Sequence, residues 1–215
     1  MKRIAIVGGG PKRYIPQLNA YHEESMVWIG ADQGAEVLYE QGIPMQLAIG
    51  DFDSVTDNRL DEIRGYAGVT EVYPEEKDDT DLELALKAAI QEQPDEIYLF
   101  GVTGGRIDHT LANVHLLHQT DRAGIKAIII DKQNHIELTT PGEHQVQKND
   151  SYPYLSFIPM SLTVEQLTLH GFYYPLENKT LPIGSTLCMS NKLVKEYGTF
   201  SYSQGILLLI RSRDS

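Results

Sequence analysis

Two aspartates, two positions apart, directly follow a short apolar run of the chain. They are Asp51 and Asp53, within the sequence Gly-Asp-Phe-Asp-Ser of residues 50–54, and the apolar run covers residues 47–49. In extended backbone, side chains at positions i and i+2 point the same way, so both carboxylates would aim at one point. Such close charges oppose each other's ionisation unless a cation lies between them, and Mg²⁺ prefers oxygen ligands of this kind. The alternative is a solvated turn, which aspartates also favour.

A second acidic cluster covers residues 75–81, which read Glu-Glu-Lys-Asp-Asp-Thr-Asp. It precedes a segment whose apolar residues recur at helical spacing. One acid at a helix start is stabilising, but several acids repel one another. A capped, solvated helix start therefore accounts for Thr80 and one aspartate, whereas a metal site shared with the first pair accounts for more of the charge. Asp78 and Asp81 would share a face of a helical turn.

A glycine-rich turn that contains an arginine forms the third group. Residues 104–110 read Gly-Gly-Arg-Ile-Asp-His-Thr and open another segment of helical spacing. Glycine lets the backbone approach a ligand closely, and a helix N-terminus offers free N–H groups to a phosphate. Arg106 can bind phosphate oxygens through two donors, and Asp108 can bind a metal, a ribose hydroxyl or Arg106 itself. The P-loop pattern G-x-x-x-x-G-K-[ST] does not occur in the chain.

Together these three groups favour metal-assisted transfer of a phosphorus group from a nucleotide. A different class of enzyme stays open, the nicotinamide-dependent oxidoreductases. Gly8-x-Gly10 follows a first apolar run and Asp32 follows a second, which matches part of the dinucleotide-binding pattern, although Arg13 occupies the place of its third glycine. A non-catalytic sensor of ATP and Mg²⁺ would carry the same acidic groups and would release no AMP.

Strand-like apolar runs alternate with helical segments in the first part of the chain, including a helix expected from Pro11 to about Tyr21. The alternation predicts a three-layer α/β/α domain with a mostly parallel sheet over residues 1–135, in which ligands bind beyond the carboxyl ends of the strands. All three groups of candidate residues follow such ends. The expected strands cover residues 4–7, 26–29, 47–49, 69–73, 97–100 and 127–130.

Helical spacing disappears after about residue 138, where short β-rich runs separated by glycine and proline take its place. These runs predict an antiparallel β-sandwich over residues 140–215, with the boundary between the two domains near residues 132–141. The expected strands of this second domain cover residues 154–158, 162–169, 172–174, 186–189, 198–202 and 206–210.

The charge of the chain is uneven. The formal net charge is −12, and residues 1–139 hold 24 acidic and 12 basic residues whereas residues 140–215 hold six of each. An acidic balance argues against a nucleic-acid partner and suits a metal or a cationic ligand. Cys188 is the single cysteine, which excludes an intrachain disulfide and suits a reducing compartment, and we expect it to pack rather than react. The N-terminal apolar run is too short for a signal peptide or a membrane span, so we expect a soluble, cytoplasmic protein.

The motifs and their order resemble the thiamin pyrophosphokinase family, in its bacterial type. The resemblance rests on residues 31–35, 50–54, 77–81 and 104–113, and it continues in residues 171–176 and 190–191. It implies an α/β nucleotide-binding domain, a β-sandwich and a homodimer, with the active site between the α/β domain of one subunit and the sandwich of the other. The implied reaction requires Mg²⁺ and moves the pyrophosphoryl group of ATP to the hydroxyl of thiamin, giving thiamin diphosphate and AMP.

The same resemblance implies roles for individual residues, carried over by position. The residues expected in catalysis are Asp51, Asp53, Asp78 and Asp81, and those expected to bind the metal are Asp51, Asp53 and Asp81. The residues expected to hold ATP are Thr80, Gly104, Gly105, Arg106, Asp108 and His109. The residues expected to hold thiamin are Asp32, Gln33, Ser190 and Asn191, the last two from the second subunit. Asp53 or Asp78 is also a candidate acceptor for the hydroxyl proton. Gln33 stands where the family usually has glycine, and Lys192 where bacterial members often carry an acid.

Overall fold

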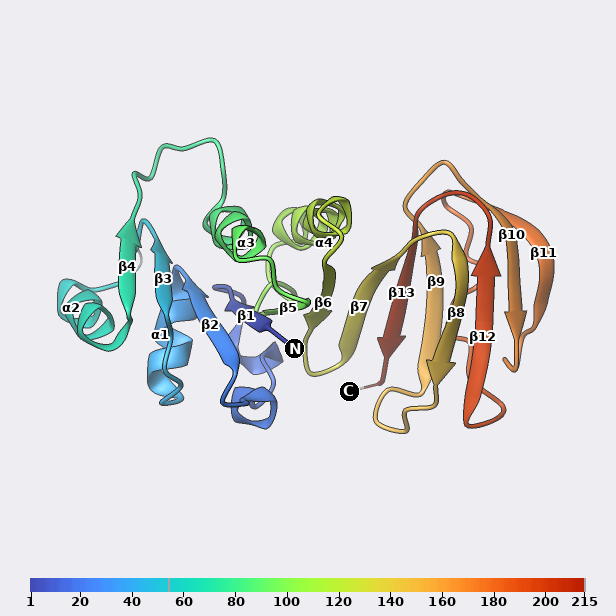
Figure 1. Cartoon of the computed structure of the whole chain (residues 1–215), viewed down its shortest axis with the longest axis horizontal. Coiled ribbons are helices and arrows are strands. Elements are labelled where there is room, and N and C mark those ends of the chain that lie inside the picture. The colour runs from blue at the N-terminus through green and yellow to red at the C-terminus, as the bar shows by residue number, and fades with distance from the viewer. Residues whose placement is uncertain (54, 215) are drawn as a thin grey trace. The chain divides into compact units, whose positions relative to one another are not determined.

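The computed structural model describes residues 1–53 and 55–214, so Ser54 of the first aspartate motif lies outside the described residues. The chain forms two compact units, Met1–Lys132 and Gln133–Ser215 (Figure 1). They divide at the start of the 132–141 region that the sequence analysis marks as a boundary. Among the described residues, no helix combines the length and apolarity that a membrane crossing requires.

The first unit is built on a parallel sheet. Its strands pair in the order β4-β3-β2-β1-β5-β6, and each neighbouring pair among them is parallel. Each strand lies within two residues of its predicted range, which confirms the parallel sheet inferred from the apolar runs. The strands are β1 (Arg3–Val7), β2 (Met26–Ala31), β3 (Leu47–Gly50), β4 (Val69–Val72), β5 (Glu96–Phe100) and β6 (Lys126–Ile130).

Helices cover both faces of this sheet and complete the predicted three layers. Figure 1 shows α1 and α2 on one face and α3 and α4 on the other. In agreement, α1 packs against β1, β2 and α2, whereas α3 packs against the first three strands and α4. The helices are α1 (Gln33–Glu40), α2 (Asp57–Tyr66), α3 (Asp81–Gln91) and α4 (Ile107–Arg122).

The prediction of one helix from Pro11 to Tyr21 is wrong. Two short 3-10 helices, η1 (Lys12–Tyr14) and η2 (Leu18–Tyr21), stand there instead. The break lies at Pro16, because proline has no N–H to donate and disfavours helical geometry in the residue before it. Ile15 accordingly has ψ 127°, an extended value.

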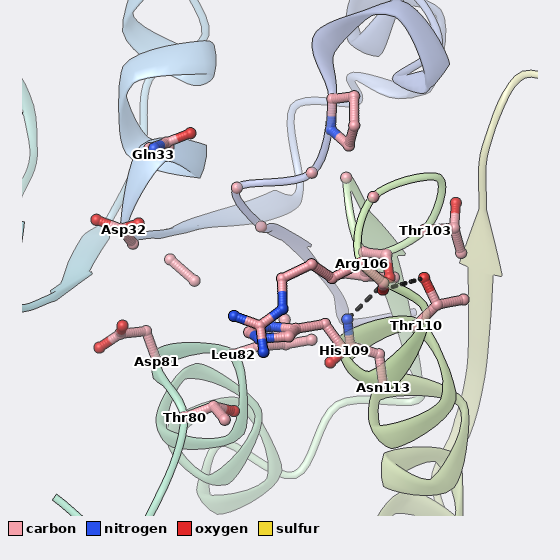
Figure 2. A pocket seen from close by; sticks show the side chains of 18 of the residues that line it. Asp32, Gln33, Thr80, Asp81, Leu82, Thr103, Arg106, His109, Thr110 and Asn113 are labelled. Atoms are coloured by element: carbon pink, nitrogen blue, oxygen red, sulfur yellow. Dashed lines mark hydrogen bonds between the residues drawn. The ribbon is translucent and has the colours of Figure 1, made fainter. Parts of the chain in front are cut away.

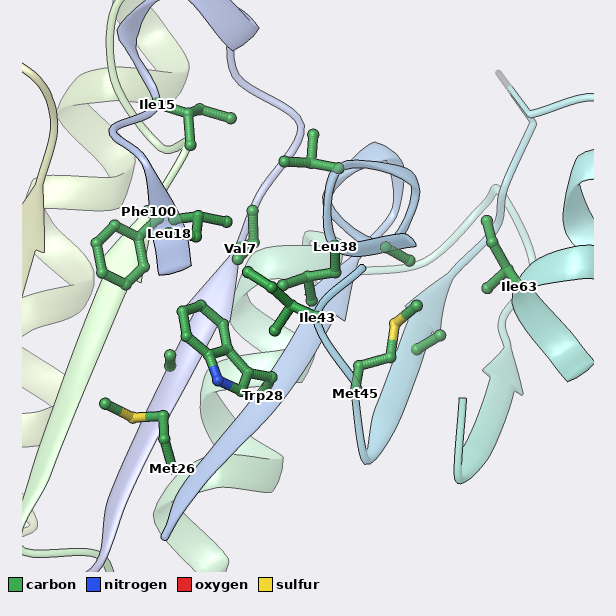
Figure 3. Packing of buried hydrophobic residues seen from close by; sticks show 14 of the residues in the cluster. Val7, Ile15, Leu18, Met26, Trp28, Leu38, Ile43, Met45, Ile63 and Phe100 are labelled. Atoms are coloured by element: carbon green, nitrogen blue, oxygen red, sulfur yellow. The ribbon is translucent and has the colours of Figure 1, made fainter. Parts of the chain in front are cut away.

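Large buried side chains fix the sheet under α1 and α2. Trp28 of β2 and Phe100 of β5 are fully buried and stacked, with ring centroids 6.0 Å apart. Leu38 of α1 and Ile63 of α2 belong to the same cluster (Figure 3). Burying one such side chain contributes about 1.5–3 kcal/mol to folding. The cluster therefore holds the ends of the strands, from which the candidate residues extend, in fixed positions.

The second unit is a β-sandwich, as predicted. Phe157 of one sheet lies 5.0 Å from Phe200 of the other between ring centroids, and apolar residues of both sheets form one core. One sheet has the order β7-β13-β9, from β7 (Asn134–Thr139), β13 (Leu207–Ser212) and β9 (Tyr154–Pro159). The other has the order β11-β10-β12-β8, from β11 (Leu176–Pro182), β10 (Thr163–His170), β12 (Tyr197–Tyr202) and β8 (Gly142–Gln147).

Several strand predictions in this unit are wrong. Residues 172–174 and 186–189 do not form strands, and the strands β7, β8 and β11 were not expected. Each of β8 and β11 buries only one residue, and the other residues of both strands are mostly polar. Their sequences therefore lack the alternation of apolar and polar residues from which a strand is predicted. Cys188, in the 186–189 run, lies in a turn and is buried. Its burial raises the pKa of its thiol to about 11. Cys188 therefore packs, as expected.

Candidate active site

A cavity of about 510 Å³ lies beyond the carboxyl ends of the strands of the first unit (Figure 2). The loops after β1, β2 and β5 line it. The strand order reverses at β1, since β2 lies on one side of it and β5 on the other, and α/β sheets bind ligands at such a reversal. Of the residues predicted from the sequence, the cavity is lined by Asp32, Gln33, Thr80, Asp81, Gly105, Arg106 and His109.

The glycine-rich loop after β1 also lines the cavity. Gly8 donates its N–H to the carbonyl of Phe100 (2.8 Å) and Gly10 donates to that of Gly101 (2.7 Å), which fastens this loop to the loop after β5. The sequence analysis connected these glycines only with a nicotinamide cofactor. That pattern needs an α-helix N-terminus directly after the loop, and the chain instead forms η1 there. The loop therefore shapes this cavity without the dinucleotide feature.

The carboxylates of Asp32, Asp51 and Asp53 converge at the ends of β2 and β3, with one oxygen of each within 4.8 Å of the others. The pairing of the two strands brings them together, since Asp32 donates its N–H to the carbonyl of Ile49 (2.9 Å). Gly50 has φ 157°, and a Cβ there would lie 3.1 Å from the Cα and N of Asp32. Glycine is therefore needed for this close approach, and Asp32 itself adopts the unusual φ of 49°.

This carboxylate group fits a divalent cation. Mg²⁺ holds oxygen ligands at about 2.1 Å in octahedral geometry, which places them about 3–4.2 Å apart, and the three oxygens here lie within 4.8 Å of one another. One oxygen of Asp32, Oδ1, is buried and has no hydrogen-bond partner among the described residues. Burial, together with the charges of Asp81, Asp51 and Asp53, raises the pKa of Asp32. An unpaired oxygen and mutual repulsion are both relieved by a cation.

Lys77 lies beside this group and was not assigned a role from the sequence. Its ammonium Nζ lies 2.8 Å from Asp51 Oδ2, 3.0 Å from the carbonyl of Pro74 and 3.2 Å from Asp81 Oδ1. Hydrogen bonding from Lys77 lowers the pKa of Asp51, whereas burial raises that of Asp81 although Lys77 opposes it. The sequence feature that could have indicated a role for Lys77 is that it is the single basic residue among the acids of residues 75–81.

The predicted metal ligands are thus brought together in part. Asp51 and Asp53 meet Asp32, whereas Asp81 is linked to the group through Lys77, and the metal-binding role of Asp81 stays a prediction. Asp78 is exposed, so its catalytic role also stays a prediction. Thr80 is the N-cap of α3, where its Oγ1 accepts the N–H of Glu83 at 3.2 Å. Its hydroxyl therefore orders the start of α3 at the wall of the cavity.

Arg106 and Asp108 form a pair at the start of α4. Arg106 Nε lies 3.2 Å from Asp108 Oδ1, and Nη2 lies 2.5 Å from Oδ2. The arginine, together with the N–H of His109, lowers the pKa of Asp108 to about 2. Of the three partners left open for Asp108, the structure thus shows Arg106. The Arg106 side chain is 74% exposed and extends into the cavity in Figure 2.

Two residues of the 104–113 motif to which the sequence analysis gave no individual role hold this loop in place. Thr110 donates its hydroxyl to the carbonyl of Arg106 (3.1 Å), and Asn113 donates its amide to the carbonyl of Val102 (2.8 Å) (Figure 2). Thr103, in the same loop, donates to the buried Asp131 carboxylate at 2.6 Å. These bonds give the glycine–arginine turn a defined shape before any ligand binds.

Ser190 and Asn191 lie in the second unit. Asn191 is 1% exposed, and its carboxamide accepts the N–H groups of Tyr174 (3.0 Å) and Lys192 (2.9 Å) and donates to the carbonyl of Tyr174 (2.8 Å). Asn191 therefore orders the Tyr174 segment. Ser190 is exposed, and its φ is 52°. The thiamin-binding roles of both residues stay predictions.

Comparisons with known proteins assign the chain to a family. The family model described as "Thiamin pyrophosphokinase, catalytic domain" matches residues 18–129, and the one described as "Thiamin pyrophosphokinase, vitamin B1 binding domain" matches residues 143–207. The chain belongs to the thiamin pyrophosphokinase family. It is 50% identical over 214 residues to the thiamine pyrophosphokinase of Bacillus subtilis (strain 168), with 100% of both chains covered.

Solved structures of this family share the fold. The crystal structure of the Bacillus subtilis thiamine pyrophosphokinase matches with a TM-score of 0.95 and 49% identity, covering 100% of both chains. That of the Geobacillus thermodenitrificans thiamin pyrophosphokinase matches with a TM-score of 0.90 and 44% identity, covering 99% of this chain and 98% of the other. The family resemblance inferred from the short motifs is therefore confirmed over the whole chain.

Proposed function

We propose that this chain transfers the pyrophosphoryl group of ATP to the hydroxyl of thiamin, giving thiamin diphosphate and AMP, and that it requires Mg²⁺. The observation that carries the proposal is the convergence of the carboxylates of Asp32, Asp51 and Asp53. Of these three residues Asp32 lines the cavity, which Arg106 and the start of α4 also line. A cation-binding group next to phosphate-binding groups suits a nucleoside triphosphate with its metal. Membership of the family supports thiamin as the acceptor.

Asp32, Asp51 and Asp53 would hold Mg²⁺, and Asp81 is proposed as a further ligand. A divalent cation at this place supplies charge neutralisation for the phosphate oxygens of ATP. The acidic residues also favour approach of the thiazolium cation of thiamin, since unlike charges attract. For Asp32, which we expected to hold thiamin, the geometry thus supports a place in the metal site.

Arg106 and the Gly104-Gly105 turn are proposed to hold the phosphates of ATP. The guanidinium has five N–H donors, and Asp108 engages only two of its nitrogens, so donors remain for phosphate oxygens. Asp108 thereby orients Arg106 toward the cavity. Thr80 and His109 line the same cavity and complete the proposed ATP site.

In the transfer step the hydroxyl oxygen of thiamin forms a bond to the β-phosphorus of ATP. The bond from that phosphorus to the oxygen bridging the α- and β-phosphates breaks, and AMP leaves with that oxygen. The hydroxyl proton passes to a carboxylate, for which Asp53 and Asp78 are the candidates. Both are exposed and so accessible to an incoming substrate.

We further propose that the protein is a homodimer in which Ser190 and Asn191 contribute to the thiamin site of the second subunit. Large apolar side chains exposed on the second unit support a partner surface. They are Leu162, Tyr173, Tyr174, Ile183, Leu187, Met189, Val194 and Tyr197. Light scattering should give twice the monomer mass of 24.1 kDa, and a mass of one chain at micromolar concentration would contradict the dimer.

A mixing experiment tests the shared site. Asp53→Asn removes a metal-site carboxylate, and Ser190→Gly removes the hydroxyl while permitting the positive φ of that position. If the site is shared, co-refolded heterodimers of the two inactive variants regain part of the activity. No recovery in demonstrated heterodimers would count against a shared site. A cytoplasmic location fits the use of ATP and the single reduced cysteine.

The reaction itself is tested by AMP release from ATP and Mg²⁺, with and without thiamin, and with EDTA as a control. We expect AMP only with thiamin, in equal amount to thiamin diphosphate, and none with EDTA. Asp53→Asn should lose turnover while its circular dichroism spectrum stays that of the folded protein. ATP binding without AMP release would instead indicate the sensor function.

A further inference from the structure

The ammonium group of Lys77 contacts several oxygen atoms of the protein. An ammonium group has three N–H donors. Here it donates to Asp51 Oδ2 at 2.8 Å and to the carbonyl of Pro74 at 3.0 Å, and it forms an ion pair with Asp81 Oδ1 at 3.2 Å. The side chain is 13% exposed. Its positive charge is therefore fixed in one place, against a carboxylate that also belongs to the Asp32–Asp51–Asp53 group.

We propose that Lys77 is the internal counter-ion of the metal site, and that a divalent cation binds by displacing its ammonium group from Asp51. The inference rests on the proposed function insofar as the aspartate group must be a metal site. Three acidic side chains within 4.8 Å of one another need positive charge when no metal is bound, and Lys77 supplies it through Asp51. The metal must then compete with this charge.

Lys87 provides the contrast within the same part of the chain. It also bridges two carboxylates, Asp79 at 2.7 Å and Glu83 at 3.3 Å. Its side chain is 44% exposed, however, and neither of its partners belongs to the aspartate group. Exposed pairs of this type interact weakly. Removing Lys87 therefore takes the same charge from the same region without changing the counter-ion of the metal site.

The proposal predicts opposite effects of Lys77 on the metal-free and metal-bound protein. Lys77→Met leaves the carboxylates without their counter-ion, so the metal-free variant should unfold at a lower temperature than wild type. The same change removes the competitor, so Mn²⁺ should bind about tenfold more tightly, which corresponds to about 1.4 kcal/mol. A lysine with a purely structural role would lower the melting temperature and leave metal affinity unchanged or weakened.

The test is titration with Mn²⁺ alone, followed by electron paramagnetic resonance of the free ion, on the wild-type protein, Lys77→Met and Lys87→Met. Lys77→Gln serves as a second variant with a retained hydrogen-bond donor if Lys77→Met folds poorly. Tighter binding in the Lys77 variants, with Lys87→Met within about twofold of wild type, supports the proposal. Unchanged or weaker binding in the Lys77 variants overturns it.

Asp51→Asn separates failure of this inference from failure of the proposed metal site. If wild type binds Mn²⁺ and Asp51→Asn does not, the site exists, and the Lys77 variants alone decide the counter-ion role. If wild type and Asp51→Asn bind Mn²⁺ equally, or neither binds it, the aspartate group is not the metal site and both proposals fall together.

Discussion

Replacing Asp32 by asparagine should stabilise the metal-free protein while impairing its use of metal. Asp32 is partly buried, its Oδ1 lacks a hydrogen-bond partner among the described residues, and its carboxylate faces those of Asp51 and Asp53. Asparagine keeps the size of the side chain and tolerates the positive φ of 49° at this position. The substitution therefore removes one negative charge with little other change.

The magnitude follows from the separation of the charges. One oxygen of each carboxylate lies within 4.8 Å of the others, and at that upper limit two unit charges repel by about 0.9 kcal/mol in bulk water and about 3.5 kcal/mol at an effective permittivity of 20. Asp32 has two such neighbours, but salt screens them, and asparagine also gives up about 0.5 kcal/mol of attraction to the start of α1. We expect the free energy of unfolding to rise by about 1–2 kcal/mol at pH 7. Each kcal/mol should raise the melting temperature by about 2–4 °C.

Trp28 makes the assay specific to the unit that contains the site. It is the single tryptophan, it is fully buried, and it lies in the core of the first unit. Its fluorescence in urea or heat, with EDTA present, therefore reports unfolding of that unit. Asp61→Asn is the control, because the Asp61 side chain is 74% exposed and does not belong to the Asp32–Asp51–Asp53 group. This substitution should change the free energy of unfolding by less than about 0.5 kcal/mol.

The pH dependence provides a second readout with a defined sign. The folded protein holds the pKa of Asp32 above its ordinary value of 3.8. Ionised Asp32 therefore destabilises the fold at pH 7, and this destabilisation disappears as pH falls through the raised pKa toward 3.8. The advantage of Asp32→Asn should shrink on acidification and in high salt. If the variant is no more stable than wild type at pH 7 in EDTA, the argument from repulsion is refuted.

Three further predictions concern single side chains. Arg106→Ala should raise the KM for ATP at least about tenfold and bring the pKa of Asp108 up from about 2 toward its usual value, without changing the melting temperature; unchanged ATP kinetics would contradict the phosphate role. Thr80→Ala removes the cap that accepts the N–H of Glu83 and should destabilise the first unit by about 1 kcal/mol in urea, whereas Thr80→Ser should not. Cys188, with its thiol pKa raised to about 11, should react with iodoacetamide at pH 8 only after unfolding; rapid alkylation of the native protein would show that it is accessible.

The sequence was most informative where periodicity and strand ends coincide. Five of the six strands of the first unit were predictable because buried parallel strands are short apolar runs, whereas β4, at the edge of the sheet, is largely exposed. The rule that ligands bind beyond the carboxyl ends of such strands located the candidate loops. It was least informative for β8 and β11, whose residues are mostly exposed and whose pairing partners hold them as strands. The prediction from sequence also failed at Pro16, because this proline interrupts the helix that was expected to begin at Pro11.

The sequence alone determined which residues were candidates for the chemistry: Asp51 and Asp53 by their spacing, and Arg106 and Asp108 by their glycine-rich context at a helix start. The tertiary structure decided which of them meet. Asp32 joins the aspartate pair because β2 and β3 lie side by side and Gly50 leaves room for it. Lys77 neutralises Asp51 across 26 positions of the chain. Charge and spacing are local properties that can be read along the chain, whereas contacts between separate strand ends depend on the strand order of the sheet.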